Sequence, residues 1–187
     1  MDTLWSWTAH QAIAYGRTTR HRETMEELRR LRRVFAELHP GYTLVFDTGP
    51  RPIAVQLRYW NREPSVLAAA RELQDSAAGW LGVELYPASP DSAALLRFLD
   101  RVETYQPIHR PTVAVPGLSL HGQLRAFDFA VMHEDRVVAT TSSKTIDAVW
   151  KAGGWADRLR TAVQQSGARL SGPMVTPPEP WHYERIP

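Results

Sequence analysis

A histidine and an aspartate seven residues apart have the residue types and the spacing that could hold a metal ion. His121 and Asp128 lie in the segment PGLSLHGQLRAFD, residues 116–128, and both side-chain types are common zinc ligands. On an unbroken strand this odd spacing would direct them to opposite faces. We therefore expect the chain to bend or bulge between them, and Gly122 offers the backbone freedom for it.

A carboxylate and a second histidine follow near the C-terminus, in the segment EPWHY at 179–183. Glu179 precedes His182 by three residues, and Pro180 between them disfavours a helix interior. A turn or bent strand could direct His182 to a metal and Glu179 to a neighbouring water, as hydrolytic sites require. Three protein ligands with one open position would distinguish a catalytic zinc site from a closed structural one.

Both segments resemble motifs of one enzyme family. SLHGQLRAFD resembles the serine-x-histidine and alanine-x-aspartate motif of the VanX and VanY type D-alanyl-D-alanine metallopeptidases, and EPWHY resembles their glutamate-x-tryptophan-histidine motif. The lead-in VPGLSLHG, at 115–122, is similar to that of members from actinobacteria and phages. The resemblance covers chiefly residues 42–60 and 112–187.

The resemblance implies a role for each of these residues. His121, Asp128 and His182 would be the zinc ligands, and Glu179 would be the general base that takes a proton from the attacking water. Arg51 resembles the family's arginine that follows a strand and steadies the scissile carbonyl or its oxyanion.

Two residues are candidates for substrate contact, and the sequence departs from the family pattern in two places. Gln56 falls near the family's downstream glutamine, and Ser119 either contacts substrate or only closes the turn before the first histidine. The tyrosine-arginine-serine pattern around Arg51 is absent, because Gly49 and a proline precede it. Leu124 stands where the family has glycine.

The expected activity is zinc-dependent hydrolysis of the D-amino-acid-containing peptide stems of bacterial peptidoglycan, by a D,D-carboxypeptidase or an endopeptidase. One alternative is a non-catalytic peptidoglycan-binding or phage structural domain that keeps the peptidase fold. Another is a nucleic-acid-binding module that uses the arginines at 29, 30, 32 and 33. Glutamates share that helix and the net charge is only +2, so a solvated helix face is favoured and no nucleic-acid partner is expected.

The elements that must position these residues indicate an α+β fold, with a small antiparallel sheet carrying the zinc site and helices mainly on one face. The family resemblance adds the Hedgehog/DD-peptidase-like fold to this expectation. We expect one domain over 1–187, with a helical part at about 1–40 and a catalytic core at about 41–187.

Hydrophobic periodicity and turn residues give the expected elements. In the first half, Thr24 and Glu27 match a capping box in the first helix. In the second half, a hairpin turns at 133–135, and Gly167 ends the last helix. The expected helices are 22–39, 52–62, 64–75, 91–104, 144–151 and 154–166, and the expected strands are 42–47 and the two arms of the hairpin at 126–141.

Composition removes several other classes of protein. The absence of cysteine excludes disulfide scaffolds and thiolate metal sites, so any metal must be held by His, Asp or Glu. The sequence contains no apolar run long enough to span a membrane, and its start does not resemble a signal peptide. We therefore expect synthesis in the cytoplasm and action on the cell wall after lysis or non-classical export, as for a phage endolysin or a delivered toxin effector.

Overall fold

The computed structural model describes residues 17–60, 62–76, 108, 111–114 and 119–186. These residues form helices and small antiparallel sheets, which confirms the α+β prediction. The described residues divide into two compact units, a smaller one within 51–122 and a larger one within 17–50 and 123–186. The expected helix at 91–104 lies outside the described residues.

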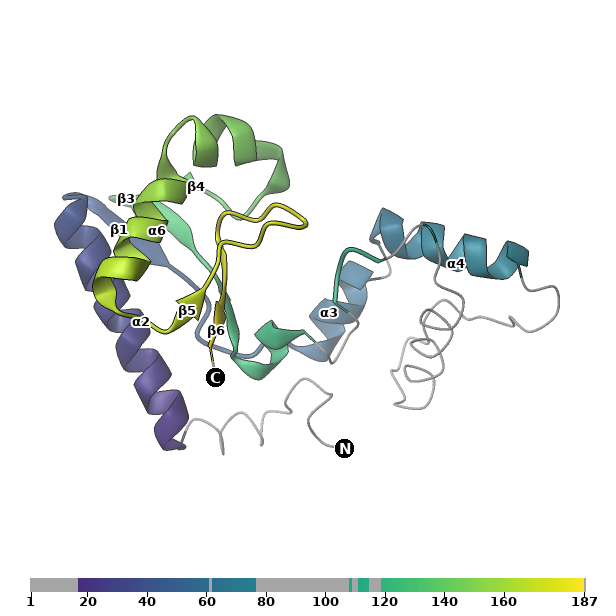
Figure 1. Ribbon diagram of the computed structural model, residues 1–187, viewed down its shortest axis with the longest axis horizontal. Coiled ribbons are helices and arrows are strands. Elements are labelled where there is room, and N and C mark those ends of the chain that lie inside the picture. Colours follow the sequence, from purple (N-terminus) through teal and green to yellow (C-terminus); the bar gives the residue numbers. More distant parts are fainter. Residues whose placement is uncertain (1–16, 61, 77–107, 109–110, 115–118, 187) are drawn as a thin grey trace. The chain divides into compact units, whose positions relative to one another are not determined.

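The larger unit contains two three-stranded antiparallel sheets (Figure 1). One has the strand order β1-β3-β4, and the other has the order β2-β6-β5. The strands are β1 (Tyr42–Val45), β2 (Ala126–Asp128), β3 (Ala130–His133), β4 (Arg136–Ala139), β5 (Leu170–Ser171) and β6 (His182–Arg185).

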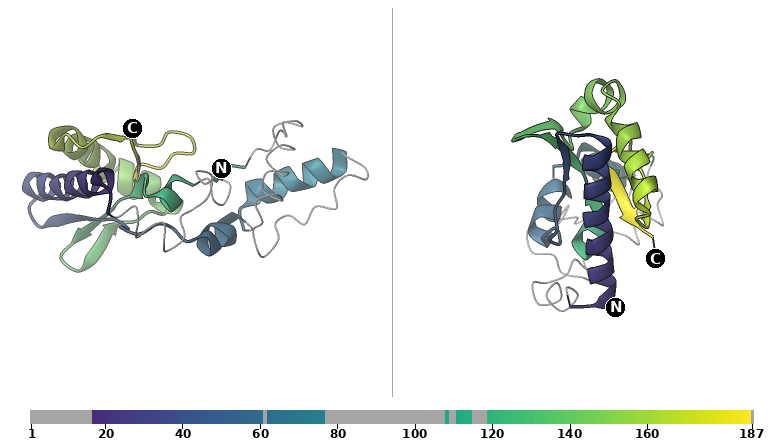
Figure 2. Two further views of the ribbon diagram at one scale, coloured as in Figure 1. Left: turned by 90° about the horizontal axis from the view of Figure 1, so that it is seen from below. Right: turned by 90° about the vertical axis from the view of Figure 1, so that its left-hand side faces the viewer.

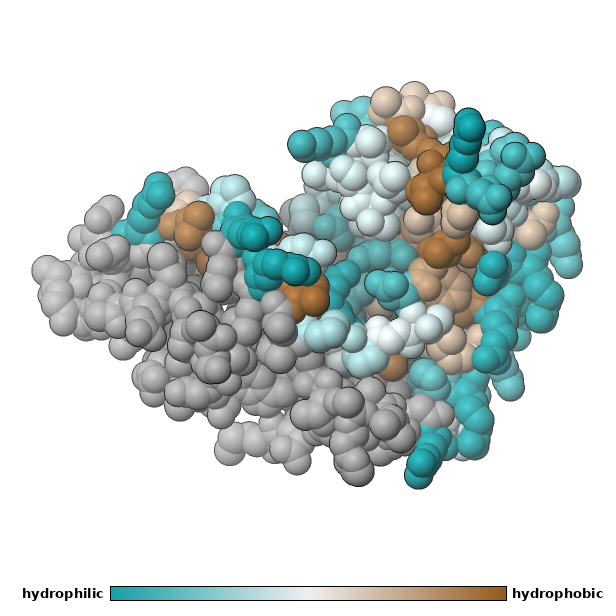
Figure 3. All heavy atoms as spheres, turned by 180° about the vertical axis from the view of Figure 1, so that it is seen from behind, coloured by the Kyte–Doolittle hydropathy of each residue, from teal (hydrophilic) through white to brown (hydrophobic). Residues whose placement is uncertain are grey.

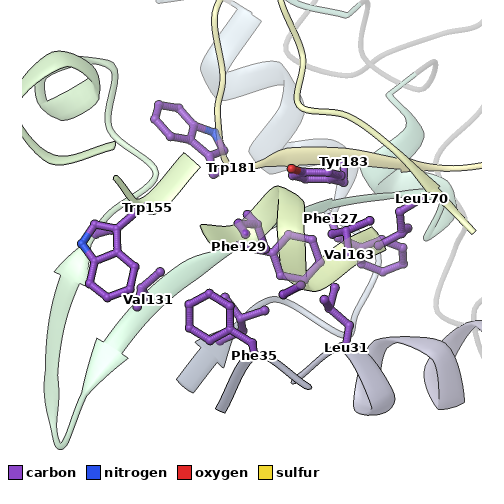
Figure 4. Close-up of a cluster of buried hydrophobic side chains, with 14 of the residues drawn as sticks. Leu31, Phe35, Phe127, Phe129, Val131, Trp155, Val163, Leu170, Trp181 and Tyr183 are labelled. Carbon is purple, nitrogen blue, oxygen red and sulfur yellow. The ribbon is translucent and has the colours of Figure 1, made fainter. Parts of the chain in front are cut away.

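Helices α2 (Thr19–Leu38) and α6 (Trp155–Ser166) lie side by side in this unit (Figure 2). Their apolar stripes meet the strands in a common core, in which aromatic side chains from α2, β2 and β6 pack together (Figure 4). Burial of these stripes is the main stabilising contribution to both helices. Apolar patches bordered by hydrophilic residues remain on the face seen from behind (Figure 3).

The N-terminus of α2 differs from the expected one. The helix begins at Thr19, and the side chain of Thr18 caps it by accepting a hydrogen bond from the amide of His21. Thr24 lies inside the helix, where its hydroxyl donates to the carbonyl of Arg20. The prediction of a capping box at Thr24 and Glu27 was therefore wrong.

Glu27 has a different role, because its carboxylate is buried and ties α2 to the sheet β2-β6-β5. Its Oε1 atom lies 2.9 Å from Nε of Arg169 and 3.3 Å from Nη2 of Arg185. Its Oε2 atom accepts the backbone N–H of Arg169. Nε of Arg185 donates to the hydroxyl of Thr24, one turn before Glu27 in the helix. The network holds β6 against α2 through charge-assisted hydrogen bonds.

The expected hairpin at 126–141 is confirmed only for β3 and β4, which pair around the turn at Glu134 and Asp135. Residues 126–128 instead form β2, which belongs to the other sheet. The break falls at Phe129, whose amide donates to the carbonyl of Trp181. The chain thus passes from one sheet to the other immediately after Asp128.

Between β4 and α6 the chain forms a 3₁₀ turn η3 (Ser143–Thr145) and a π-helical turn η4 (Ile146–Lys151), where an ordinary helix was expected. The predicted end of α6 is confirmed, since Gly167 adopts a left-handed conformation with φ 62° and caps the helix. Glycine takes this conformation without the steric cost of a Cβ atom.

The smaller unit contains α3 (Ile53–Trp60), α4 (Pro64–Ser76) and most of the 3₁₀ helix η2 (Leu120–Gln123). The expected helices at 52–62 and 64–75 are confirmed by α3 and α4. None of the described helices is both long enough and apolar enough to cross a membrane.

Candidate metal centre

Two of the predicted ligands face each other across neighbouring strands. Asp128 ends β2 and His182 begins β6, and the two are direct antiparallel partners. Nδ1 of His182 lies 3.0 Å from Oδ1 of Asp128, with the histidine buried and the aspartate partly exposed. The register of the strand pair therefore places an imidazole nitrogen and a carboxylate oxygen together at the end of the sheet.

The third predicted ligand reaches the same place from a turn. His121 lies in η2, so it is not on a strand with Asp128, and the expected bend between them is confirmed. The bend was assigned to the wrong residue, because Leu124, not Gly122, has a positive φ of 53°. The left-handed conformation costs a non-glycine residue about 1–2 kcal/mol. Leu124 is nevertheless buried, and burial of a leucine side chain offsets a cost of that size.

His121, Asp128 and His182 form a group that could hold a metal ion. One ligand atom from each residue lies within 4.8 Å of the others. Two atoms bound to one tetrahedral zinc at ~2.0 Å are about 3.3 Å apart, which is close to the 3.0 Å between Asp128 and His182. Two imidazoles and a carboxylate are also a donor set found at catalytic zinc sites, so these residues fit the expected ion.

Glu179 lies beside this group on the loop before β6. Its amide donates to the carbonyl of Met174, and its own carbonyl accepts from the amide of His182. These bonds fix the backbone of the loop on both sides. The carboxylate Oε2 atom lies 3.7 Å from Nδ1 of His182, and the Glu179 side chain is about one-third exposed, at 34%. Glu179 is therefore next to the predicted ligands and accessible to water.

Glu184 is a further acidic residue of the site that sequence reasoning missed. It lies two residues after His182 on β6, and its Oε1 atom is 3.5 Å from Nε2 of the histidine. Side chains two apart on a strand share a face, so the spacing alone could have indicated this contact.

The surroundings of His182 shift its pKa in two directions. Burial lowers the pKa, while the hydrogen bond and charge of Asp128, assisted by Glu179 and Glu184, raise it, and the net effect is a raised pKa. The three carboxylates around the ring thus favour its protonation relative to that of a free histidine.

The remaining predicted residues occupy the smaller unit. The amide of Arg51 donates to the carbonyl of His121, and its guanidinium lies 5.8 Å from the centre of the Tyr59 ring. The side chain of Gln56 is buried and donates to the carbonyl of Arg51. Ser119 is buried, and its carbonyl accepts the amide of Gly122, which closes the turn at His121. Arg51 and Gln56 therefore brace the backbone that carries the first histidine.

Comparisons with protein-family models, curated proteins and solved structures found no match to this chain.

Proposed function

We propose that the protein is a zinc-dependent peptidase that hydrolyses D-amino-acid-containing peptide stems of bacterial peptidoglycan. The observation that carries the proposal is the grouping of His121, Asp128 and His182 around one point, with the carboxylate of Glu179 beside them. This arrangement combines a three-residue ligand set with a partly exposed base, which are the two parts that metal-assisted hydrolysis needs.

The roles of the residues follow from their positions. His121, Asp128 and His182 would hold the zinc, which when bound supplies a Lewis acid that activates water and polarises a carbonyl. Glu179 takes a proton from the attacking water and passes it to the leaving amine. Its fixed backbone and partly exposed carboxylate suit this transfer, because a general base must be held within reach of the proton that it abstracts.

The substrate class is supported by the motif resemblance. Stem peptides that end in D-alanine would be cut at the terminal residue by a carboxypeptidase, and internally by an endopeptidase. The guanidinium of Arg51 is proposed to stabilise charge that develops on the scissile carbonyl. An enzyme of this kind would act on the bacterial cell wall.

The first test measures zinc content and hydrolysis together. Elemental analysis of protein purified without chelator should find one zinc per chain, and mass spectrometry of muropeptides after incubation should show shortened stems. Glu179→Gln should keep the zinc and the fold but lower turnover by about 10²- to 10⁴-fold, because only the base is removed.

Other results would refute the metal site, the activity or the role of a single residue. Absence of zinc even after its addition would refute the metal site. Zinc binding without cleavage of any muropeptide would leave a non-catalytic wall-binding domain, and undiminished hydrolysis by Glu179→Gln would show that Glu179 is not the base. If the turnover of Arg51→Ala stays within a few-fold of that of the parent, Arg51 has no part in the mechanism.

A further inference from the structure

Glu184 is fixed beside His182 by the central strand of its sheet. Residue 184 pairs with Ala126 of β2 on one side and with Ser171 of β5 on the other. Its side chain lies on the same face of β6 as His182, and the alternate residues Tyr183 and Arg185 are buried. The Glu184 side chain is 44% exposed, and its Oε1 atom lies 3.5 Å from Nε2 of His182.

The two nitrogens of the His182 ring face different partners. Nδ1 faces the predicted ligand Asp128 at 3.0 Å and the predicted base Glu179 at 3.7 Å. Nε2 faces Glu184. A neutral imidazole that gives the Nδ1 lone pair to a metal carries its only proton on Nε2. Glu184 then lies where that N–H needs an acceptor.

We propose that Glu184 is a positioning residue of the metal centre, which accepts the Nε2–H of His182 and thereby holds the ring in the tautomer that presents Nδ1 to the ion. The inference rests on the proposed metal site and goes beyond it. An acceptor in this position fixes the orientation of a histidine ligand, and loss of such a partner weakens metal binding by about 10- to 100-fold. Glu184 acts through His182 and need not touch the substrate.

Two conservative variants separate the hydrogen bond from the charge. Glu184→Gln keeps an acceptor oxygen at the same distance along the side chain but removes the charge. Glu184→Asp keeps the charge but withdraws the acceptor by one methylene. Competition with a chromogenic chelator would measure the zinc dissociation constant of the full chain. Glu37→Ala is the control, because Glu37 is an exposed residue at the C-terminal end of α2.

We expect Glu184→Asp to weaken zinc binding by about tenfold or more, and Glu184→Gln to stay within a few-fold of the parent. Long-range ¹H–¹⁵N NMR of the zinc-loaded protein should show a protonated Nε2 on His182 in the parent and in Glu184→Gln. In Glu184→Asp this proton should exchange faster with water.

The opposite order of affinities would overturn the proposal, because it would show that only the charge of Glu184 matters. Equal affinity and an unchanged Nε2–H signal in all variants would also overturn it. A parent protein that binds no zinc would refute the metal site itself, so failure of the proposed function and failure of this inference are distinguishable.

Discussion

Removal of the buried carboxylate of Glu27 is expected to be one of the most destabilising single changes in the larger unit. The Glu27 side chain is 11% exposed and that of Arg185 only 4%. Glu27→Ala removes the acid and leaves the arginine charge buried without its counter-charge. Removing one partner of a buried ion pair typically costs about 3–5 kcal/mol.

Two structural details place the expected loss at the lower end of that range. Arg185 keeps hydrogen bonds to the hydroxyl of Thr24 and to the carbonyls of Arg169 and Ile186. The second partner, Arg169, is half exposed at 51%, so its pair with Glu27 contributes at most about 1 kcal/mol. We therefore expect Glu27→Ala to lower the free energy of unfolding by about 3 kcal/mol. Glu27→Gln, which keeps an acceptor, should lose about 1–2 kcal/mol.

The matched control lies one turn earlier on the same helix. Glu23 also pairs with Arg169, at 3.3 Å, but both side chains are 51% exposed, so Glu23→Ala should change stability by no more than about 0.5–1 kcal/mol. Urea unfolding followed by tryptophan fluorescence gives the three values from the midpoint and slope. A loss in Glu27→Ala no larger than that in Glu23→Ala would refute the argument that burial makes this pair important.

Two further predictions concern the ring of Tyr183. A Cβ atom at Gly172 would lie 2.5 Å from Cδ1 of this buried ring and 2.7 Å from the carbonyl oxygen of His182, so Gly172→Ala should cost about 1–3 kcal/mol by overpacking and weaken zinc binding. Gly49→Ala, which has open space around the new atom, is the control in urea unfolding and chelator competition, and equal effects would contradict the packing argument. The Tyr183 hydroxyl is buried with no hydrogen-bond partner among the described residues, so Tyr183→Phe should be neutral or stabilising near pH 7. Burial raises the pKa of Tyr183 to about 12, so the parent should lose stability relative to Tyr183→Phe as the pH rises from the unfolded value of about 10. If the stabilities of the parent and of Tyr183→Phe change equally with pH over that range, the Tyr183 hydroxyl is hydrated.

The parts of the fold that could be predicted are those set by local patterns. The apolar stripe of α2 and the glycine that ends α6 each fix an element through short-range physics, and both were predicted. The three ligands were also predicted as a group, because the two segments that carry them resemble the metallopeptidase motifs. The absence of cysteine only restricted the possible ligands to His, Asp and Glu. The convergence of the three residues confirms the grouping, whereas zinc and catalysis stay predictions.

The parts that could not be predicted depend on contacts between distant segments. Apolar alternation continues through Phe129, so the sequence gives no sign that the chain leaves one sheet there. The break depends on a hydrogen bond to Trp181. Glu27 matched a local capping pattern, but tertiary contacts with Arg185 determine its role. The left-handed conformation of Leu124 could not be predicted from the sequence either, because leucine has no preference for it.

Because Asp128 pairs directly with His182, binding of a metal at the proposed site would depend on the register of β2 against β6. Side chains alternate faces along a strand, so a slip of one residue between β2 and β6 would place the two ligands on opposite faces. The same slip would turn Phe127 and Tyr183, which are also direct partners, out of the core. Only the native register would bring the ligands of the proposed site together, and a bound metal would in turn favour that register over slipped alternatives by its binding free energy. Mutations that shift this pairing should therefore remove the metal centre and the packed core in one step.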